Sequence, residues 1–276
     1  MKKLSFSILI FLIGIFQVQS QNSFNMPEEH KAFKQQLMDE IHGNVNNYSK
    51  PNLSSKQNFF KSGTDDWGDA PDWSWATQFG GSGSDFARDI VSDEAGNVFI
   101  TGSFSGEITV GSNNYTSIGK RDVIVAKFDN SGNLIWLKQF SAAVNEQIDA
   151  FGICHDESEN IYITGYYTGN VTLGSITLIN IADKNLFFTK LDPSGEVIMA
   201  KNHGLSDETQ IGLKIDTDDT GNIYILGSTD NNTAWRHPSI ILKYDQVGNV
   251  IWEQQHDESF NDIMVFNSNI YFAALV

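Results

Sequence analysis

The chain repeats two short phrases at nearly the same interval, and this repetition constrains its fold more than any other feature. "DEAGNVFITG" at 93–102 returns as "DESENIYITG" at 156–165 and "DDTGNIYILG" at 218–227, so the closing glycines lie 63 and 62 residues apart. A second set comprises "FDNSGNLIW" at 128–136, "LDPSGEVIM" at 191–199 and "YDQVGNVIW" at 244–252. Two phrases that keep nearly one period indicate tandem supersecondary units.

Each unit of about 60 residues is predicted to contain four β-strands. In the first unit we expect strands at about 86–92, 97–103, 122–128 and 133–139. The first and second pairs are joined by "DEAG" and "DNSG", in which Asp caps backbone amides and Gly supplies the positive φ of a short hairpin. Residues 104–121 are expected to form a long loop or a small additional hairpin.

The strand composition favours an all-β propeller over other β folds. "VIVAKF", "LFFTKL" and "SIILKY" are almost continuously apolar, as expected for strands buried on both faces. Sheets stacked against one another bury both faces of their middle strands, and the small residues Ala87, Ala150 and Gly212 suit a crowded first strand. A β-solenoid is the alternative, although its period is usually shorter. We expect three complete blades and a partial fourth, which stops after two strands.

The first unit resembles the bacterial β-propeller repeat known as SBBP. The resemblance is carried by "WSWATQFGGSGSDFARDIVSDEAGNVFITGSF" and "GKRDVIVAKFDNSGNLIW", and it extends over about residues 73–276. The later units depart from the pattern at Glu159, which replaces the turn Gly, and at Met199, which replaces Trp. The resemblance implies the propeller fold and an extracellular address, and it implies no common catalytic residues.

The N-terminal region differs from the repeats. Residues 1–20 have two lysines followed by a short apolar run, which predicts a secretory signal peptide and a secreted or cell-surface protein without membrane insertion. Residues 21–72 predict a short amphipathic helix, with Phe33, Leu37 and Ile41 on one face, and then a polar linker. At the other end, the incomplete fourth unit predicts truncation at Val276 or an exposed edge that supports self-association.

Charge and cysteine content exclude several classes of function. The formal net charge of −16 disfavours binding to nucleic acid or to anionic lipid. Cys154 is the single cysteine, so the chain has no intramolecular disulfide, and its apolar neighbours predict a buried, inert thiol. Motifs for a cofactor, a zinc site or a nucleophilic hydrolase do not occur in the sequence.

Aromatic residues outside the repeat pattern are the candidate ligand-binding residues. Trp235, Arg236 and His237 lie in a loop that breaks the pattern of the third unit, and Tyr166 and Tyr167 follow the second strand of the second unit. Such residues stack on sugars or anchor a protein partner. For each of them the alternative is ordinary packing, which we expect for Trp136 and Trp252 because they recur at one repeat position.

The acidic turn "DTDDTGN" is a weak calcium candidate, with Asp216, Asp218 and Asp219 as oxygen ligands. The twelfth position of a calcium loop would fall on Gly227 instead of Glu, and the repeated hairpin turn already explains Asp218. A related expectation concerns Lys127, which precedes Asp129 by two residues, as do the equivalent lysines of the later units. Each Lys is expected to pair with that Asp on one face of the strand.

These features favour a non-enzymatic scaffold or binding module that contacts an extracellular protein or glycan and has no cofactor. The alternative is a carbohydrate-active hydrolase or lyase, or a fragment of one, because carboxylates are plentiful. A third hypothesis is a quinone-dependent oxidoreductase, since the Asp-x-x-Gly-x-x-x-Trp pattern also resembles the propeller repeats of those enzymes.

Overall fold

The computed structural model describes residues 75–204, 209–230, 238–266 and 269–274. The predicted signal peptide, helix and linker lie outside these ranges, as do Trp235, Arg236 and His237. The described residues form β-strands, turns and loops without a helix, so this part of the chain is all-β as predicted. No helix in these ranges is therefore long and apolar enough to cross a membrane.

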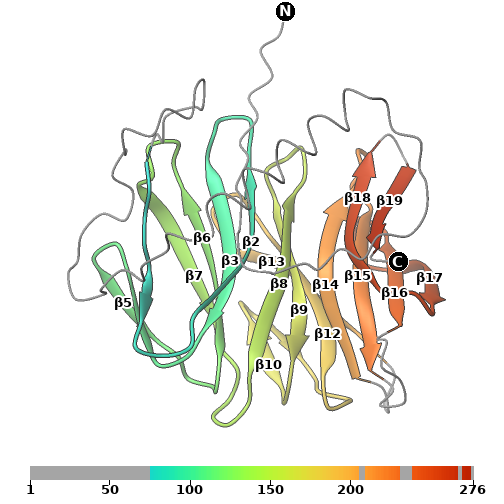
Figure 1. Ribbon diagram of the computed structural model, residues 1–276, viewed down its shortest axis with the longest axis horizontal. Helices are drawn as coiled ribbons and strands as arrows, with labels where there is room; N and C mark the ends of the chain where they lie inside the picture. The colour runs from blue at the N-terminus through green and yellow to red at the C-terminus, as the bar shows by residue number, and fades with distance from the viewer. Residues whose placement is uncertain (1–74, 205–208, 231–237, 267–268, 275–276) are drawn as a thin grey trace, which may run out of the picture. The chain divides into compact units, whose positions relative to one another are not determined.

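Three four-stranded antiparallel sheets follow one another in chain order (Figure 1). The first sheet contains β2 (Phe86–Ser92), β3 (Val98–Phe104), β6 (Asp122–Phe128) and β7 (Leu134–Phe140). The second contains β8 (Ile148–His155), β9 (Ile161–Tyr167), β12 (Asn185–Leu191) and β13 (Val197–His203). The third contains β14 (Thr209–Thr217), β15 (Ile223–Asp230), β16 (Ser239–Tyr244) and β17 (Val250–His256). Each sheet thus has the four consecutive strands that the repeat predicted.

A two-stranded hairpin follows the third sheet. It consists of β18 (Phe260–Phe266) and β19 (Asn269–Ala274), and we call it the terminal hairpin. The first two units also contain short strands that form two small separate sheets. One sheet consists of β1 (Gly80–Gly81), β4 (Glu107–Val110) and β5 (Asn113–Thr116), and the other of β10 (Val171–Leu173) and β11 (Ile176–Leu178). The β4–β5 hairpin confirms the second of the two expectations for residues 104–121.

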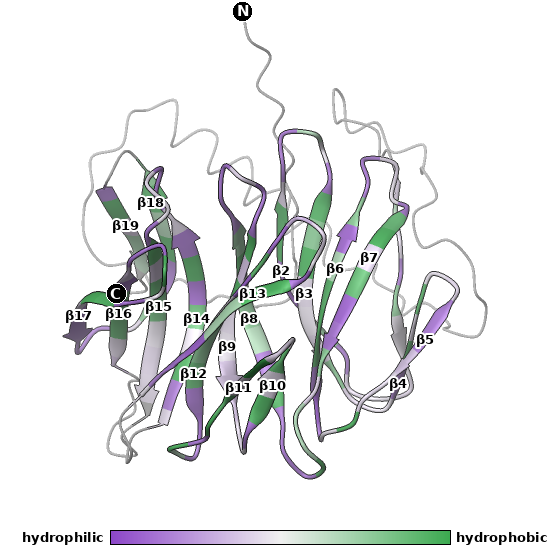
Figure 2. Ribbon diagram, turned by 180° about the vertical axis from the view of Figure 1, so that it is seen from behind, coloured by the Kyte–Doolittle hydropathy of each residue, from purple (hydrophilic) through white to green (hydrophobic). Residues whose placement is uncertain are grey.

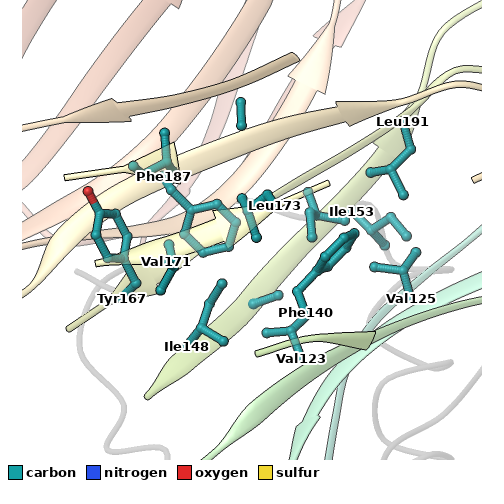
Figure 3. Packing of buried hydrophobic residues seen from close by; sticks show 14 of the residues in the cluster. Val123, Val125, Phe140, Ile148, Ile153, Tyr167, Val171, Leu173, Phe187 and Leu191 are labelled. Carbon is teal, nitrogen blue, oxygen red and sulfur yellow. The ribbon is translucent and has the colours of Figure 1, made fainter. Parts of the chain in front are cut away.

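Consecutive sheets pack face to face, and the first strands β2, β8, β14 and β18 each contact the next. Between the first two sheets, Val123 and Val125 of β6 face Ile153 of β8 and Phe187 of β12 (Figure 3). Every residue of β6 and β9 is buried, because each strand is covered on both faces, as the apolar runs predicted. The arrangement is that of successive propeller blades.

The first strand of each sheet contains a β-bulge at the same repeat position. The register shifts between Ala87 and Asp89, and it shifts at the matching places in β8, β14 and β18. The extra residues are Arg88, Phe151, Leu213 and Asn261. In the second sheet the bulge brings the Asp149 carbonyl oxygen within 1.9 Å of where a Cβ on Gly165 would lie, which explains the glycine that closes the "ITG" phrase.

The Asp-x-x-Gly turns share one hydrogen-bond pattern. In the turn at Asp129, the carboxylate accepts the amides of Ser131 and Asn133, both at 2.8 Å, and the side-chain amide of Asn133. Gly132 has a φ of 81°, which suits glycine. Glu159 occupies the same place in the second unit with a φ of 62°, so a residue with a Cβ adopts the left-handed conformation there.

The indole of Trp136 joins one sheet to the next. It packs on the turn glycine Gly195 of the second sheet, and its N–H donates to the Pro193 carbonyl oxygen at 3.2 Å. Trp75 makes the same contact one sheet earlier and donates to Asn130 at 3.1 Å. Residues 75–79 thus occupy the place of a preceding fourth strand, although they form no strand.

Candidate functional site

Only two of the five predicted aromatic-loop residues lie within the described ranges, Tyr166 and Tyr167. Tyr167 is fully buried, and its hydroxyl donates to the Ile179 carbonyl oxygen at 2.9 Å, so it packs within the second sheet. Tyr166 is also largely buried, but its ring borders a group of charged side chains. This group is the strongest candidate for a binding site in the part of the chain that the structure describes.

We call this group the cationic cluster. Its members come from the same end of the first two sheets, where β2 and β8 begin, β9 ends, and the chain enters β6 and β12. They are Phe86, Arg88, Arg121, Asp149, Phe151, Tyr166 and Lys184. None belongs to the repeated Asp-x-x-Gly turns, which lie at the opposite end of the strands. The cluster therefore consists of residues that the repeat leaves free to vary.

The Arg88 side chain lies between two aromatic rings. Its guanidinium carbon is 4.5 Å from the ring centroid of Phe86 and 4.6 Å from that of Phe151. Because Arg88 and Phe151 are both bulge residues, the bulges of adjacent sheets bring the two side chains together. Cation–π contacts and aromatic packing stabilise the position of the guanidinium group.

Arg121 is neutralised by a carboxylate, in contrast to Arg88. One Arg121 nitrogen, Nη1, donates to both oxygens of Asp149 at 3.0 Å, and the Asp149 side chain is fully buried. The Arg121 guanidinium also lies 5.4 Å from the Phe86 centroid. Among the described residues, Arg88 forms no ion pair with a carboxylate, and its buried Nε has no hydrogen-bond partner.

Burial lowers the pKa of Arg88, Asp149 opposes this shift, and the positive charge of Arg121 adds to it. Burial, followed by the charge of Asp149, raises the pKa of Tyr166 to about 12. Lys184 lies with its Nζ 5.0 Å from the Tyr166 ring. The cluster thus contains three cations and one carboxylate, and this excess of positive charge is able to attract an anion.

Gln210 lies beside the cluster at the start of β14. Its backbone amide donates to the Lys184 carbonyl oxygen at 3.1 Å. The side chain is 1% exposed, and neither its amide nitrogen nor its oxygen has a partner among the described residues. A buried amide without partners is costly, and such groups are uncommon away from functional sites.

The prediction that each repeated lysine pairs with the Asp two residues after it is wrong. Lys190 contacts Asp156 at 3.3 Å and Lys243 contacts Asp218 at 3.7 Å, so these two lysines pair across the sheet with the first turn of their own unit. Lys127 lies 3.9 Å from Glu159 of the next unit. The Lys190 ammonium also lies 5.0 Å from the centroid of Tyr162, its cross-strand neighbour. Register places the lysine beside this neighbouring turn, whereas the sequence spacing suggested its own turn.

The three weak calcium candidates do not form a common site. Asp218 is engaged by its own turn and by the hydroxyl of Tyr224 at 2.9 Å, and Asp216 accepts the amides of Thr217 and Val265. Asp219 is exposed. Groups of three or more His, Cys, Asp or Glu side chains placed to hold a metal ion do not occur in the described ranges.

Three other features bear on catalysis. Cys154 is buried as predicted, and burial raises the pKa of its thiol well above the usual value, which disfavours the reactive thiolate. A surface depression of about 490 Å³ lies beside β13 and is lined by Ile176, Lys190, Ile198, Met199, Ala200, Lys201, Gln246 and Val247, without a carboxylate. Asp216 has a pKa raised by burial, but its two oxygens accept backbone amides.

The comparison with family models decides the nature of the repeat. The model of the SBBP β-propeller repeat matches residues 74–103. These residues carry an SBBP repeat. The match includes Trp75, β1 and β2 and most of β3, so it confirms the resemblance for the unit in which the motifs are clearest.

Two further similarities extend beyond this repeat. An uncharacterized WD repeat-containing protein of Acanthamoeba polyphaga mimivirus is 27% identical over 157 residues, which cover 50% of this chain and 11% of that protein. The chain therefore spans about a tenth of the length of this curated relative. BamB from Moraxella catarrhalis aligns with 72% of this chain and 95% of its own, at 8% identity and a TM-score of 0.15, which is too low to compare the folds.

Proposed function

We propose that this protein is an exported, non-enzymatic β-propeller-repeat module that binds a carboxylate-bearing glycan at the cationic cluster. The observation that carries the proposal is Arg88, whose guanidinium lies between two aromatic rings and whose buried Nε has no hydrogen-bond partner among the described residues. The SBBP repeat and the WD repeat-containing relative support a scaffold role. The sequence of residues 1–20 supports export.

The chemistry of the cluster favours a carboxylate as the ligand group. A guanidinium group presents a planar set of donors that matches two carboxylate oxygens. Arg121 already donates to both oxygens of Asp149 through Nη1, which leaves Arg88 and Lys184 for an incoming anion. With a net charge of −16, the whole chain repels polyanions such as nucleic acid, so a ligand with spaced single carboxylates fits better.

A uronic acid unit combines a carboxylate with an apolar sugar face. Phe86 is exposed enough to meet that face, and it lies directly beside Arg88. Aromatic side chains bury such faces effectively, and a neighbouring cation then fixes the orientation of the carboxylate. These contacts favour an acidic glycan over a neutral one and over a flexible acidic peptide.

The absence of catalysis is part of the proposal. A hydrolase of this class would place two carboxylates about 5–9 Å apart in one cleft. The depression beside β13 has no acidic side chain in its lining, and Asp149 in the cluster is occupied by Arg121. No observation in the described residues favours the hydrolase, lyase or quinone alternatives.

Calorimetric titration of the full chain with an oligogalacturonate and with a neutral oligosaccharide of equal length tests the proposal. We expect binding of the acidic sugar alone, weakened at least about tenfold by Arg88→Met, since hydrogen bonds to charged groups contribute roughly 1.5–3 kcal/mol. Lys201→Met on β13 is the matched control and should leave binding unchanged.

Three results would contradict the proposal: equal affinity for the neutral sugar, no binding of the acidic one, or shortening of either sugar by the pure protein. A peptide with a free C-terminal carboxylate provides a further arm. Tighter binding of the peptide than of the uronate, with the same dependence on Arg88, would identify a protein partner instead of a glycan.

A further inference from the structure

Every sheet in this chain has two different faces. We call the face on the side of the preceding sheet the leading face, and the face on the side of the following sheet the trailing face. At one repeat position of the leading face the residues are Ile90, Ile153, Ile215 and Ile263. At one position of the trailing face they are Phe99, Tyr162, Tyr224 and Tyr271. Comparison of burial at equivalent positions shows which faces are covered.

On the leading face, the residue of the first sheet is the exception. Ile153, Ile215 and Ile263 are 5%, 5% and 7% exposed, whereas Ile90 is 48% exposed. The three buried residues each lie against the preceding sheet. Ile90 has the same side chain in the same place of the repeat, so its exposure marks a leading surface that no sheet of the described residues covers.

On the trailing face, the residue of the terminal hairpin is the exception. Phe99, Tyr162 and Tyr224 are 0%, 0% and 3% exposed, whereas Tyr271 is 49% exposed. Met264 pairs with Tyr271 across the hairpin and is 54% exposed, and Phe266 is 60% exposed. Figure 2 shows hydrophobic positions on β18 and β19. Three large exposed apolar side chains on one short hairpin indicate a docking surface.

The two exposed surfaces are complementary, because one is open at its first strand and the other is formed by the first strands of a sheet. Trp75 and Phe79 cover Phe128 on β6, with ring centroids 6.3 and 6.5 Å from that of Phe128. They therefore cover the part of the leading face near the third strand and leave Ile90 on the first strand open. Among the described residues the terminal hairpin is a sheet of two strands, which match the first two strands of the complete sheets. The terminal hairpin, which corresponds to the first and second strands of a sheet, fits the area of the leading face that residues 75–79 leave open.

We propose that the trailing surface of one copy, formed by Met264, Phe266 and Tyr271, packs on the leading surface of a second copy around Ile90. The contact continues the sheet-to-sheet packing that occurs three times within the chain. One composite blade then combines β18 and β19 of one copy with residues 75–79 of the other. This inference is independent of the proposed glycan site.

Such a contact joins two different surfaces, so it is heterologous and leads either to a closed ring or to an open filament. A ring of two copies is the smallest closed assembly that this contact allows, and we expect such a dimer, in which the contact is made twice.

Sedimentation velocity of the full chain, with light scattering for absolute mass, is the first measurement. The unaltered chain should be a dimer at micromolar concentration. Tyr271→Asp and Ile90→Asp should each raise the dissociation constant at least about thirtyfold, as expected for a central apolar contact. Ile179→Asp places the same charge at an exposed isoleucine away from both surfaces and should leave the dimer intact.

Mixing the two variants distinguishes the proposed contact from a self-complementary one. The Tyr271→Asp protein keeps an intact leading surface and the Ile90→Asp protein keeps an intact trailing surface, so an equimolar mixture should form a heterodimer through one contact. Recovery of association also shows that both variants are folded. Circular dichroism of each variant alone provides the same control independently.

Two results would overturn the proposal. One is a monomeric unaltered chain, including the case in which deletion of residues 21–72 converts it to a dimer, because that segment would then be the occupant. The other is a dimer that persists in both variants or that fails to re-form in the mixture, because its interface would then lie elsewhere.

Discussion

The two ends of each sheet follow different rules. At the turn end, the Asp-x-x-Gly motif repeats with the same hydrogen bonds, as at Asp129 and Asp192. At the opposite end, where β2 and β8 begin, equivalent positions carry unrelated side chains, and a guanidinium lies between aromatic rings. The turn end satisfies its polar groups locally, whereas at the cluster end Arg88 Nε and the Gln210 side-chain amide have no partner among the described residues. Structural stability and ligand chemistry are thus separated along the strands.

The bulge beneath the cluster gives the largest predicted effect. Gly165→Ala would place a Cβ 1.9 Å from the Asp149 carbonyl oxygen, so the backbone of β8 must shift, and we expect a loss of about 3 kcal/mol in the free energy of unfolding. Urea denaturation measures the change. Gly106→Ala, whose Cβ would meet no neighbour, should cost only about 1 kcal/mol for its positive φ. Equal losses would show that the bulge does not set the requirement for glycine.

A turn aspartate tests the opposite end of the strands. Burial alone would raise the pKa of Asp218, but hydrogen bonds from Thr220, Asn222 and Tyr224 outweigh it and lower the pKa to about 2. Asp218→Ala should therefore cost about 2 kcal/mol near pH 7. Asp219→Ala, in the same turn but exposed, should change stability by less than about 0.5 kcal/mol.

The pH dependence of that loss follows from the sign of the shift. A carboxylate whose pKa is lower in the folded state than in the unfolded chain stabilises the fold above the unfolded pKa of about 4. This stabilisation disappears as the pH falls through about 2. The difference between the unaltered protein and Asp218→Ala should thus be largest above pH 5 and shrink at lower pH. A difference that is constant with pH would contradict the charge-based account.

The irregular turn of the second unit offers a smaller, stabilising change. Glu159 has a φ of 62°, and glycine adopts this conformation without the steric cost of a Cβ. Glu159→Gly should raise the free energy of unfolding by about 1 kcal/mol, despite losing a 3.9 Å contact with Lys127. Glu157→Gly, in the same turn without a positive φ, should lower stability slightly. If both variants lose stability, the Glu159 side chain has a role beyond its backbone conformation.

Arg88→Met should have the smallest effect on stability and is the sharpest test of the comparison between the two ends. Met keeps much of the apolar packing between Phe86 and Phe151 and removes a partly buried charge that forms no ion pair among the described residues. We expect the free energy of unfolding to rise by about 0.5 kcal/mol while glycan binding is lost. Thermal and urea denaturation measure it. A loss of more than about 1 kcal/mol would make Arg88 a structural residue instead.

Much of the fold could be predicted because the same pattern of strands and turns occurs three times in the sequence. Strands predicted at 86–92 and 122–128 have these bounds in β2 and β6, and those predicted at 97–103 and 133–139 are displaced by one residue. The turns were equally predictable, since Asp and Gly act within five residues of each other. The β-bulges were not predicted, although the unexplained glycine after each "IT" or "IL" pair was their signal in the sequence.

The cationic cluster could not be derived from the sequence because its members meet only when two sheets pack. Arg88 and Arg121 are separated by 33 positions and enter from β2 and from the loop before β6, and Phe151 arrives from the next sheet. Tyr166 was chosen for its position after an apolar strand, and the structure places it in the cluster. The partner of each repeated lysine was mistaken for a related reason, since cross-strand register outweighs sequence spacing.

The bulge position in the first strand has a consequence for how such proteins diversify. Arg88, Phe151, Leu213 and Asn261 occupy one structural slot, yet they are cationic, aromatic, aliphatic and amide side chains. The slot lies outside the regular alternation of the strand, so its occupant changes without moving the residues on either side. When a blade is duplicated, its bulge position can therefore change without a large effect on folding. Selection is thus able to alter the binding specificity of one blade at a time.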